Sequence, residues 1–276
     1  MGLVLRNPEG KALEYAKHAV SIYRRCSNQC EYCYLDKGRG STTLGHGTPE
    51  LRTCFYNEDD AIKKFKKELL KNREQLIKDG GIFFCFTTDP CLRETINVTR
   101  ECAKEAMLEG VPVTILTKMA WWIYEKEYRK EILEVGKQTG LLCVGFSLTG
   151  RDDKEPYADN NHERVLAMKE IHFMGIKTFA SIEPILQFNK SLAMIRETLG
   201  SCDLYKIGLL SKCGKDYYEH DDALKFVNNV NNLLMDDMNC AKVYYKESIR
   251  KFLDYDLILG LQPICVGADF NIFTDL

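Results

Sequence analysis

The sequence predicts an α/β fold in which βα units surround a parallel sheet. Short apolar runs of strand length alternate along the chain with longer amphipathic segments of helix length. Polar side chains follow several of the apolar runs, at the positions where strands would end. The 276 residues are 45% hydrophobic and 28% charged, which suits one ordinary globular domain with a sizeable core.

The expected elements can be justified in chain order from their apolar pattern. Each strand is a short run rich in β-branched, aromatic or aliphatic residues, and each helix is a longer segment with charged residues on one side. The expected strands cover residues 19–23, 82–86, 111–118, 141–148, 176–184, 204–209 and 242–245. The expected helices cover residues 58–79, 93–109, 123–138, 161–173, 189–198 and 220–236.

Three cysteines near the start of the chain have the spacing C-x3-C-x2-C. They are Cys26, Cys30 and Cys33, directly after the first expected strand. Three thiolates this close in sequence can hold three irons of a [4Fe–4S] cluster and leave the fourth iron without a protein ligand. A zinc site usually shows a second C-x2-C pair or a downstream His pair, and the sequence has neither. The spacing therefore predicts an iron–sulfur cluster.

The remaining composition limits the location and the partners. The other nine cysteines are scattered without ligand spacing, and we expect reduced core thiols in a cytoplasmic protein. No run approaches the ~20 apolar residues of a membrane span, and no signal peptide is expected because residues 1–20 lack a long apolar core. The net charge of −2 provides no global basic footprint for nucleic acid.

Polar residues recur where successive strands are expected to end. Asp89 follows the second strand, and Lys118, Ser147 and Glu183 lie at the ends of the third, fourth and fifth. In a parallel β/α barrel the carboxyl ends of the strands form the active-site face. Their recurrence at one end of successive strands favours a site over isolated loop or capping roles.

Three further motifs allow a family comparison. Aromatic residues flank the last cysteine in Tyr32-Cys33-Tyr34-Leu35, and Thr87-Thr88-Asp89-Pro90 and Ile115-Leu116-Thr117-Lys118 end the second and third strands. Over residues 18–186 the chain resembles the spore photoproduct lyase-like (DNA repair photolyase-like) family of the radical S-adenosylmethionine (SAM) superfamily. The resemblance implies a partial parallel (β/α)6 barrel over residues 1–210 and a C-terminal α/β extension over 211–276.

The resemblance also implies two cofactors and the residues that hold them. Cys26, Cys30 and Cys33 would bind a [4Fe–4S] cluster, whose open iron would chelate SAM. Tyr32 would lie against the SAM adenine, and Lys118 would meet the SAM carboxylate. An electron donor such as flavodoxin or ferredoxin would be needed to cleave SAM to a 5′-deoxyadenosyl radical.

The remaining implied contacts lie at the ends of the second, fourth and fifth strands. Thr87, Thr88 and Asp89 would hold the methionyl amine, where hydroxyl and carboxylate oxygens suit an ammonium. Ser147 would reach the ribose or the carboxylate through its hydroxyl. Glu183 would contact either the cofactor or the substrate.

The chain departs from the family at the hydrogen-atom donor of the repair lyase. Aligned on Asp89, the position of that catalytic cysteine holds Phe86. Cys85 and Cys91 are the two candidate donors nearby. Strand parity predicts that Cys85 points away from the site unless a bulge intervenes, and Cys91 lies on a loop whose direction the sequence does not define.

Three functions therefore stay open at the level of sequence. The first is a radical SAM enzyme that abstracts hydrogen from a nucleobase or nucleic-acid substrate, as in the photoproduct lyases. The second keeps the radical chemistry but acts on a small metabolite or a peptide, which the near-neutral charge permits. The third is a non-catalytic iron–sulfur binding protein.

Overall fold

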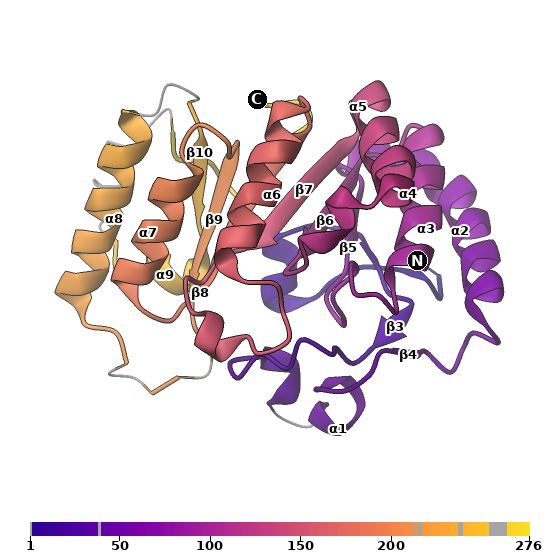
Figure 1. The fold of residues 1–276 in the computed structure, drawn as a ribbon, viewed down its shortest axis with the longest axis horizontal. Coiled ribbons are helices and arrows are strands. Elements are labelled where there is room, and N and C mark those ends of the chain that lie inside the picture. The colour runs from indigo at the N-terminus through magenta and orange to yellow at the C-terminus, as the bar shows by residue number, and fades with distance from the viewer. Residues whose placement is uncertain (1, 38–39, 212, 215–216, 237–239, 254–263) are drawn as a thin grey trace.

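The fold is a curved, mostly parallel sheet with helices on its outer side (Figure 1). The computed structural model describes residues 2–37, 40–211, 213–214, 217–236, 240–253 and 264–276. Its eight-stranded sheet has the order β1-β2-β5-β6-β7-β8-β9-β10, in which only β1 is antiparallel to its neighbour. The strands are β1 (Leu5–Arg6), β2 (Ala19–Val20), β5 (Ile82–Phe84), β6 (Val113–Thr117), β7 (Leu142–Ser147), β8 (Lys177–Ile185), β9 (Leu204–Leu209) and β10 (Lys242–Tyr245).

Helices connect the parallel strands as expected for a partial β/α barrel, so this prediction is confirmed. The main helices are α2 (Glu58–Lys78), α3 (Ile96–Leu108), α5 (Val135–Thr139), α6 (Asn161–Phe173), α7 (Phe188–Thr198) and α8 (His220–Met235). Six strand–helix units are followed by β10, which adds a seventh parallel strand beside β9. Among the described residues, no helix is long and apolar enough to cross a membrane.

The expected helix over residues 123–138 is broken into short pieces. A 3₁₀ turn (Trp121–Tyr124), a helical turn α4 (Lys126–Tyr128) and a π turn (Arg129–Glu134) precede α5. Trp122 is fully buried, and its indole N–H donates to the carbonyl of Met119 at 3.0 Å. The 3₁₀ turn places the Trp122 indole in the core while its N–H keeps a hydrogen-bond acceptor.

The expected strand over residues 19–23 is divided between β2 and a second short strand that begins at Tyr23, and the other short elements around the cysteines had no detectable pattern in the sequence. Strands β3 (Tyr23–Arg24) and β4 (Glu50–Leu51) pair antiparallel and form a separate two-stranded sheet. A one-turn helix, α1 (Ser41–Leu44), lies between them. Two-residue strands are too short to show the alternation on which strand prediction depends. Together they close the base of the loop that carries the three cysteines.

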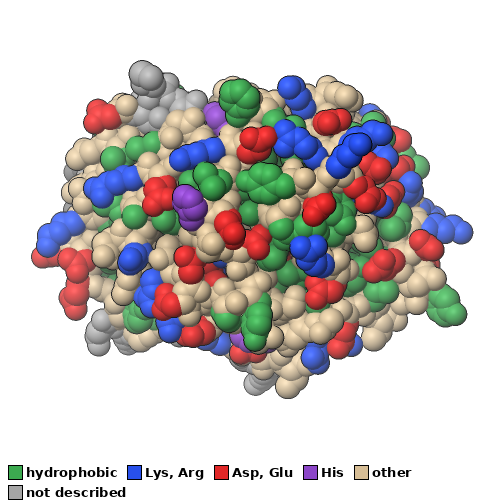
Figure 2. All heavy atoms as spheres, viewed as in Figure 1, with side chains coloured by type: hydrophobic (Ala, Val, Ile, Leu, Met, Phe, Trp, Pro, Cys, Tyr) green, Lys and Arg blue, Asp and Glu red, His purple; other side chains and the backbone are tan. Residues whose placement is uncertain are grey.

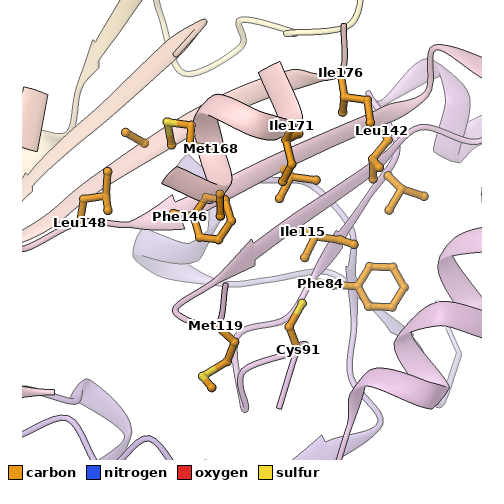
Figure 3. Packing of buried hydrophobic residues seen from close by; sticks show 14 of the residues in the cluster. Phe84, Cys91, Ile115, Met119, Leu142, Phe146, Leu148, Met168, Ile171 and Ile176 are labelled. Atoms are coloured by element: carbon orange, nitrogen blue, oxygen red, sulfur yellow. The ribbon is translucent and has the colours of Figure 1, made fainter. Parts of the chain in front are cut away.

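Alternate side chains of the strands enter two different apolar layers. The outer layer lies between sheet and helices and includes Phe84, Ile115 and Phe146 (Figure 3). The inner layer lies on the concave side of the sheet and joins strand residues to the C-terminal tail. Its buried members are Phe83, Cys143, Phe179, Leu204, Tyr244 and Ile272. Both faces are therefore covered, as parallel sheets require.

The C-terminal region contributes directly to this sheet. β10 pairs parallel with β9, and Ile272 packs in the inner layer with Phe83. The division at residue 210/211 stays a prediction, and residues 254–263 of the expected extension lie outside the described residues. Described residues after 210 share the hydrophobic clusters of the preceding strands and helices.

Candidate cluster and cofactor site

The three cysteines lie on a loop that the chain itself holds in shape. Arg25 and Gln29 adopt left-handed backbone conformations, with φ of 68° and 49°, which let the loop reverse direction over few residues. The Cys33 amide donates to the carbonyl of Cys30 at 3.0 Å, and His46 Nε2 bonds the same carbonyl at 3.0 Å. The loop geometry therefore depends on bonds within the protein.

The sulfur environments fit an iron–sulfur cluster. Burial, with a contribution from Asp89, raises the pKa of Cys26 to about 12, while the backbone amides of Asn28 and Asp89 bond the sulfur and oppose this rise. Burial also raises the pKa of Cys30, and the ammonium of Lys118 opposes it. Hydrogen bonds from backbone amides to the sulfur and a nearby cation are the features that stabilise cluster thiolates.

The three thiols are close enough to interact in sequence order, Cys26 with Cys30 and Cys30 with Cys33. No group of three or more Cys, His, Asp or Glu side chains in the described part of the chain is arranged around a single metal ion. A [4Fe–4S] cluster places its cysteine ligands on different irons, so its ligands need not converge on one point. The donor set therefore suits a cluster better than a mononuclear metal.

Two buried polar atoms beside the cysteine loop have no protein partner. Thr88 is 7% exposed and its hydroxyl makes no hydrogen bond. The side-chain oxygen of Asn28 is likewise buried and unpaired. In contrast, the Thr87 hydroxyl donates to the carbonyl of Tyr23 at 2.7 Å. Buried polar atoms are normally satisfied, so Thr88 and Asn28 are candidates to bond a polar ligand, and Thr87 is occupied by the protein.

Tyr32 is fixed by an ion pair that the sequence reasoning missed. Its hydroxyl donates to Glu155, whose other oxygen accepts from Arg164 at 2.7 Å. The side chains of Glu155 and Arg164 are both 0% exposed. Arg164 also donates to the carbonyl of Ser147 at 2.8 Å. The network thus connects the cysteine loop to the end of β7.

A signal for this ion pair was present in the sequence. Arg164 falls on the helical stripe of α6 that also carries Met168 and Ile171, all of them buried. A charged residue on such a stripe needs a buried partner. Glu155 lies in the loop after β7 and shows no pattern that would identify it as that partner.

Lys118 joins the same cluster of side chains from the end of β6. Its ammonium lies 5.6 Å from the centre of the Tyr32 ring. Burial acts to lower the pKa of Lys118, but Cys30, Glu155 and Asp89 outweigh it and the pKa is raised. The amine therefore stays charged beside the cysteine loop, where it can attract an anionic group.

Glu183 lies on β8 in a second polar group, on the concave side of the sheet. Its Oε2 accepts from the hydroxyl of Tyr15 at 2.7 Å and from Lys246 at 2.6 Å. Lys206 contacts the Tyr15 ring at 5.0 Å, and burial together with Lys246 lowers the pKa of Lys206 to about 8. Sequence reasoning identified Glu183 and missed its partners, which come from distant parts of the chain.

Comparison with known proteins places this geometry in a known fold. Spore photoproduct lyase complexed with dinucleoside spore photoproduct superposes with a TM-score of 0.60 and 15% identity, over 84% of this chain and 77% of that chain. SuiB of Streptococcus suis bound to precursor peptide SuiA gives 0.58 and 11%, over 85% and 49%. A radical SAM methyltransferase from Sphaerobacter thermophilus gives 0.50 and 11%, over 84% and 67%.

This chain has the radical SAM fold. Among curated proteins, an uncharacterized protein of Methanocaldococcus jannaschii is 25% identical over 178 residues, 62% of this chain. The chain spans about 61% of the length of that relative. No protein-family model matches the sequence. At these identities the likeness establishes the fold, and the activity has to be argued from the site.

Within the radical SAM fold, the local structure bears on the two candidate hydrogen donors, Cys85 and Cys91. Strand parity applies to Cys85 only in a continuous strand, and β5 ends at Phe84, so the alternation stops there. The Cys85 sulfur lies 3.4 Å from the Thr87 amide nitrogen and from its hydroxyl. Burial and then Cys85 raise the pKa of Tyr34, the residue after Cys33, so Cys85 lies near the cysteine loop.

Phe86 and Cys91 belong to the two apolar layers. Phe86 stacks on Phe83 with ring centres 4.6 Å apart and belongs to the inner apolar layer. Cys91 is completely buried in the outer layer beside Ile115 and Met119, as Figure 3 shows. Burial and Asp89 raise the pKa of Cys91 well above its usual value. Cys85 therefore lies near Tyr34 of the cysteine loop, whereas the Cys91 thiol is enclosed in the outer layer.

Proposed function

We propose that this protein is a radical SAM enzyme. Cys26, Cys30 and Cys33 would hold a [4Fe–4S] cluster, which would supply the one-electron reduction that cleaves SAM to a 5′-deoxyadenosyl radical. The proposal is carried by one observation: Cys30, Lys118 and Tyr32 lie close together at the carboxyl ends of parallel strands. A non-catalytic cluster protein would not need this charged and aromatic pair.

The residues around the loop have distinct proposed tasks. Lys118 binds the SAM carboxylate as a buried cation, and Tyr32 offers its ring to the adenine. The unpaired hydroxyl of Thr88 accepts from the SAM amine. Ser147 is 5% exposed at the end of β7 and bonds the ribose or carboxylate. Glu183 contacts the cofactor or the substrate through its oxygen Oε1.

For the substrate we propose a nucleobase or nucleic-acid component from which hydrogen is abstracted, in a lyase-like reaction. The support is the likeness to spore photoproduct lyase complexed with dinucleoside spore photoproduct, together with the aromatic and Thr-Asp-Pro motifs. Cys85 is the candidate hydrogen-atom donor to a product radical, since its sulfur lies near the cysteine loop. A reductant such as flavodoxin or ferredoxin would supply the electron.

A second candidate substrate is a small metabolite or a peptide. Two cations beside the cysteine loop are matched by carboxylates, Arg24 by Glu50 at 2.9 Å and Lys154 by Glu31 at 2.6 Å. On the face shown in Figure 2, basic and acidic side chains are interspersed. Nucleic-acid binding draws on unmatched basic charge, so this pattern favours a less charged substrate.

Anaerobic reconstitution with iron, sulfide, dithionite and SAM tests the chemistry. We expect 5′-deoxyadenosine to form, and its absence with every substrate class would leave only the non-catalytic function. Cys30→Ala should lose the visible absorbance of the cluster, whereas Cys102→Ala, which removes a buried thiol on α3, should keep it. A normal cluster in Cys30→Ala would refute the ligand assignment.

The two substrate classes can be separated by salt dependence. A nucleic-acid enzyme should bind a single-stranded oligonucleotide with affinity that falls steeply as salt rises, because phosphate contacts release counterions. A flat response would favour the metabolite or peptide.

A further inference from the structure

The carboxylate of Asp89 is the most highly bonded acceptor of the candidate site. It is 8% exposed and lies just after β5. Its Oδ1 accepts from the Thr117 hydroxyl at 2.6 Å and from the Cys91 amide at 3.0 Å. Its Oδ2 accepts from the Asn28 side-chain amide at 3.0 Å and from the Lys118 amide at 2.7 Å. A carboxylate offers about four acceptor positions, and the protein fills all of them.

The four donors come from three separate parts of the chain. Asn28 lies between the first two cysteines of the loop, and Cys91 lies in the turn after β5. Thr117 ends β6, and Lys118 follows it. One buried carboxylate thus joins the cysteine loop to the ends of two neighbouring strands. The Asp89 main-chain amide also bonds the sulfur of Cys26.

We propose that Asp89 is a positioning residue that clamps the cysteine loop to the strand ends, and that it does not bind the SAM amine. Every acceptor position of its carboxylate is already used, so an ammonium would have to displace a protein donor. Two free acceptors lie nearby, the hydroxyl of Thr88, one residue earlier, and the side-chain oxygen of Asn28. The inference rests on the proposed function only in that the clamped loop is the one assigned to the cluster.

The clamp also defines where Lys118 lies. The bond from its backbone amide to Asp89 holds the start of the loop after β6. Its side chain then reaches the Tyr32 ring and Cys30. Loss of the carboxylate would leave the amide of Asn28 and the backbone N–H of Lys118 without acceptors in a buried site. The cysteine loop and the Lys118 backbone would then both lose their hydrogen bonds to Asp89.

Amide hydrogen exchange of the cluster-free protein tests the clamp without any cofactor. We expect Asp89→Asn to increase exchange over residues 24–34 by about tenfold or more, since a hydrogen bond to a charged group is lost. Iron content after reconstitution should fall well below that of wild type. Asp159→Asn is the matched control, because Asp159 accepts from the amides of Ala120 and Trp121 and makes no bond to the cysteine loop.

The alternative role gives the opposite pattern. If Asp89 binds the SAM amine, Asp89→Asn will keep wild-type exchange and iron content and lose only SAM affinity, and the clamp is refuted. Should Asp89→Asn not fold, Asn28→Ala removes the loop's donor alone and must raise exchange over residues 24–34. Wild-type protein that takes up no iron would refute the proposed function, while the exchange data would still decide the clamp.

Discussion

Replacement of Glu155 by Gln should destabilise the protein strongly, although it changes one atom of the side chain. Glu155 and Arg164 form an ion pair at 2.7 Å in which both side chains are 0% exposed. Burial acts to lower the pKa of Arg164, and Glu155 raises it above its usual value, so the guanidinium stays charged. In Glu155→Gln this buried charge loses its counter-ion.

The magnitude follows from the contacts that remain. Removing one partner of a buried ion pair costs about 3–5 kcal/mol. Gln keeps an oxygen for the Tyr32 hydroxyl or for Arg164, and Arg164 retains the carbonyls of Asp159 and Ser147 at 2.7 and 2.8 Å. We therefore expect the lower end, about 3 kcal/mol. For a chain of this size that corresponds to a fall of about 6–12 °C in Tm.

Denaturant and thermal unfolding of the cluster-free protein measure this effect. Lys154→Ala serves as control, because its 2.6 Å pair with Glu31 is solvent-exposed and should contribute no more than about 1 kcal/mol. The double variant Glu155→Gln/Arg164→Met should be less destabilised than the sum of the single variants. A loss for Glu155→Gln as small as that of Lys154→Ala, or strict additivity in the double variant, would refute the reasoning.

Three further outcomes are expected. Lys118→Met should weaken SAM binding to the reconstituted enzyme by about 10- to 100-fold, the loss of a charge-assisted bond; isothermal titration measures this, and unchanged affinity would contradict the assignment. The pKa of Lys206 is about 8 in the folded chain against an ordinary 10.5, so below pH 8 the ammonium is charged in both folded and unfolded chains and its burial penalty is present in full. Between those values only the unfolded chain keeps this proton, so Lys206 itself contributes a rise in the free energy of unfolding with pH. The free energy of unfolding of wild type relative to Lys206→Met should therefore increase from pH 8 to about 10.5, as denaturant titrations of both proteins at several pH values will show. Gly145→Ala should lower stability by about 1–3 kcal/mol or more, because the added Cβ would lie 2.1 Å from the Phe179 ring, whereas Gly214→Ala meets no neighbour and should be near neutral in the same unfolding assay.

The sequence by itself determined the features that depend on local pattern. Hydrophobic periodicity located α6 over residues 161–173, β9 over 204–209 and β10 over 242–245, with the boundaries that the structure has. The spacing of Cys26, Cys30 and Cys33 indicated the loop that the structure places at the strand ends. Such signals survive folding because neighbours in sequence stay neighbours in space.

Only the tertiary structure decided which side chains share an environment. Glu155 and Arg164 approach Tyr32 from a loop and a helix more than 120 residues away. The apolar stripe of α6 indicates that Arg164 is buried, but no local pattern identifies Glu155 as its partner. The sequence predicted one strand over residues 82–86, but β5 ends at Phe84. Strand parity therefore does not decide the direction of Cys85. Long-range burial selects these contacts, since a buried charge or hydroxyl must find a partner wherever the fold places one.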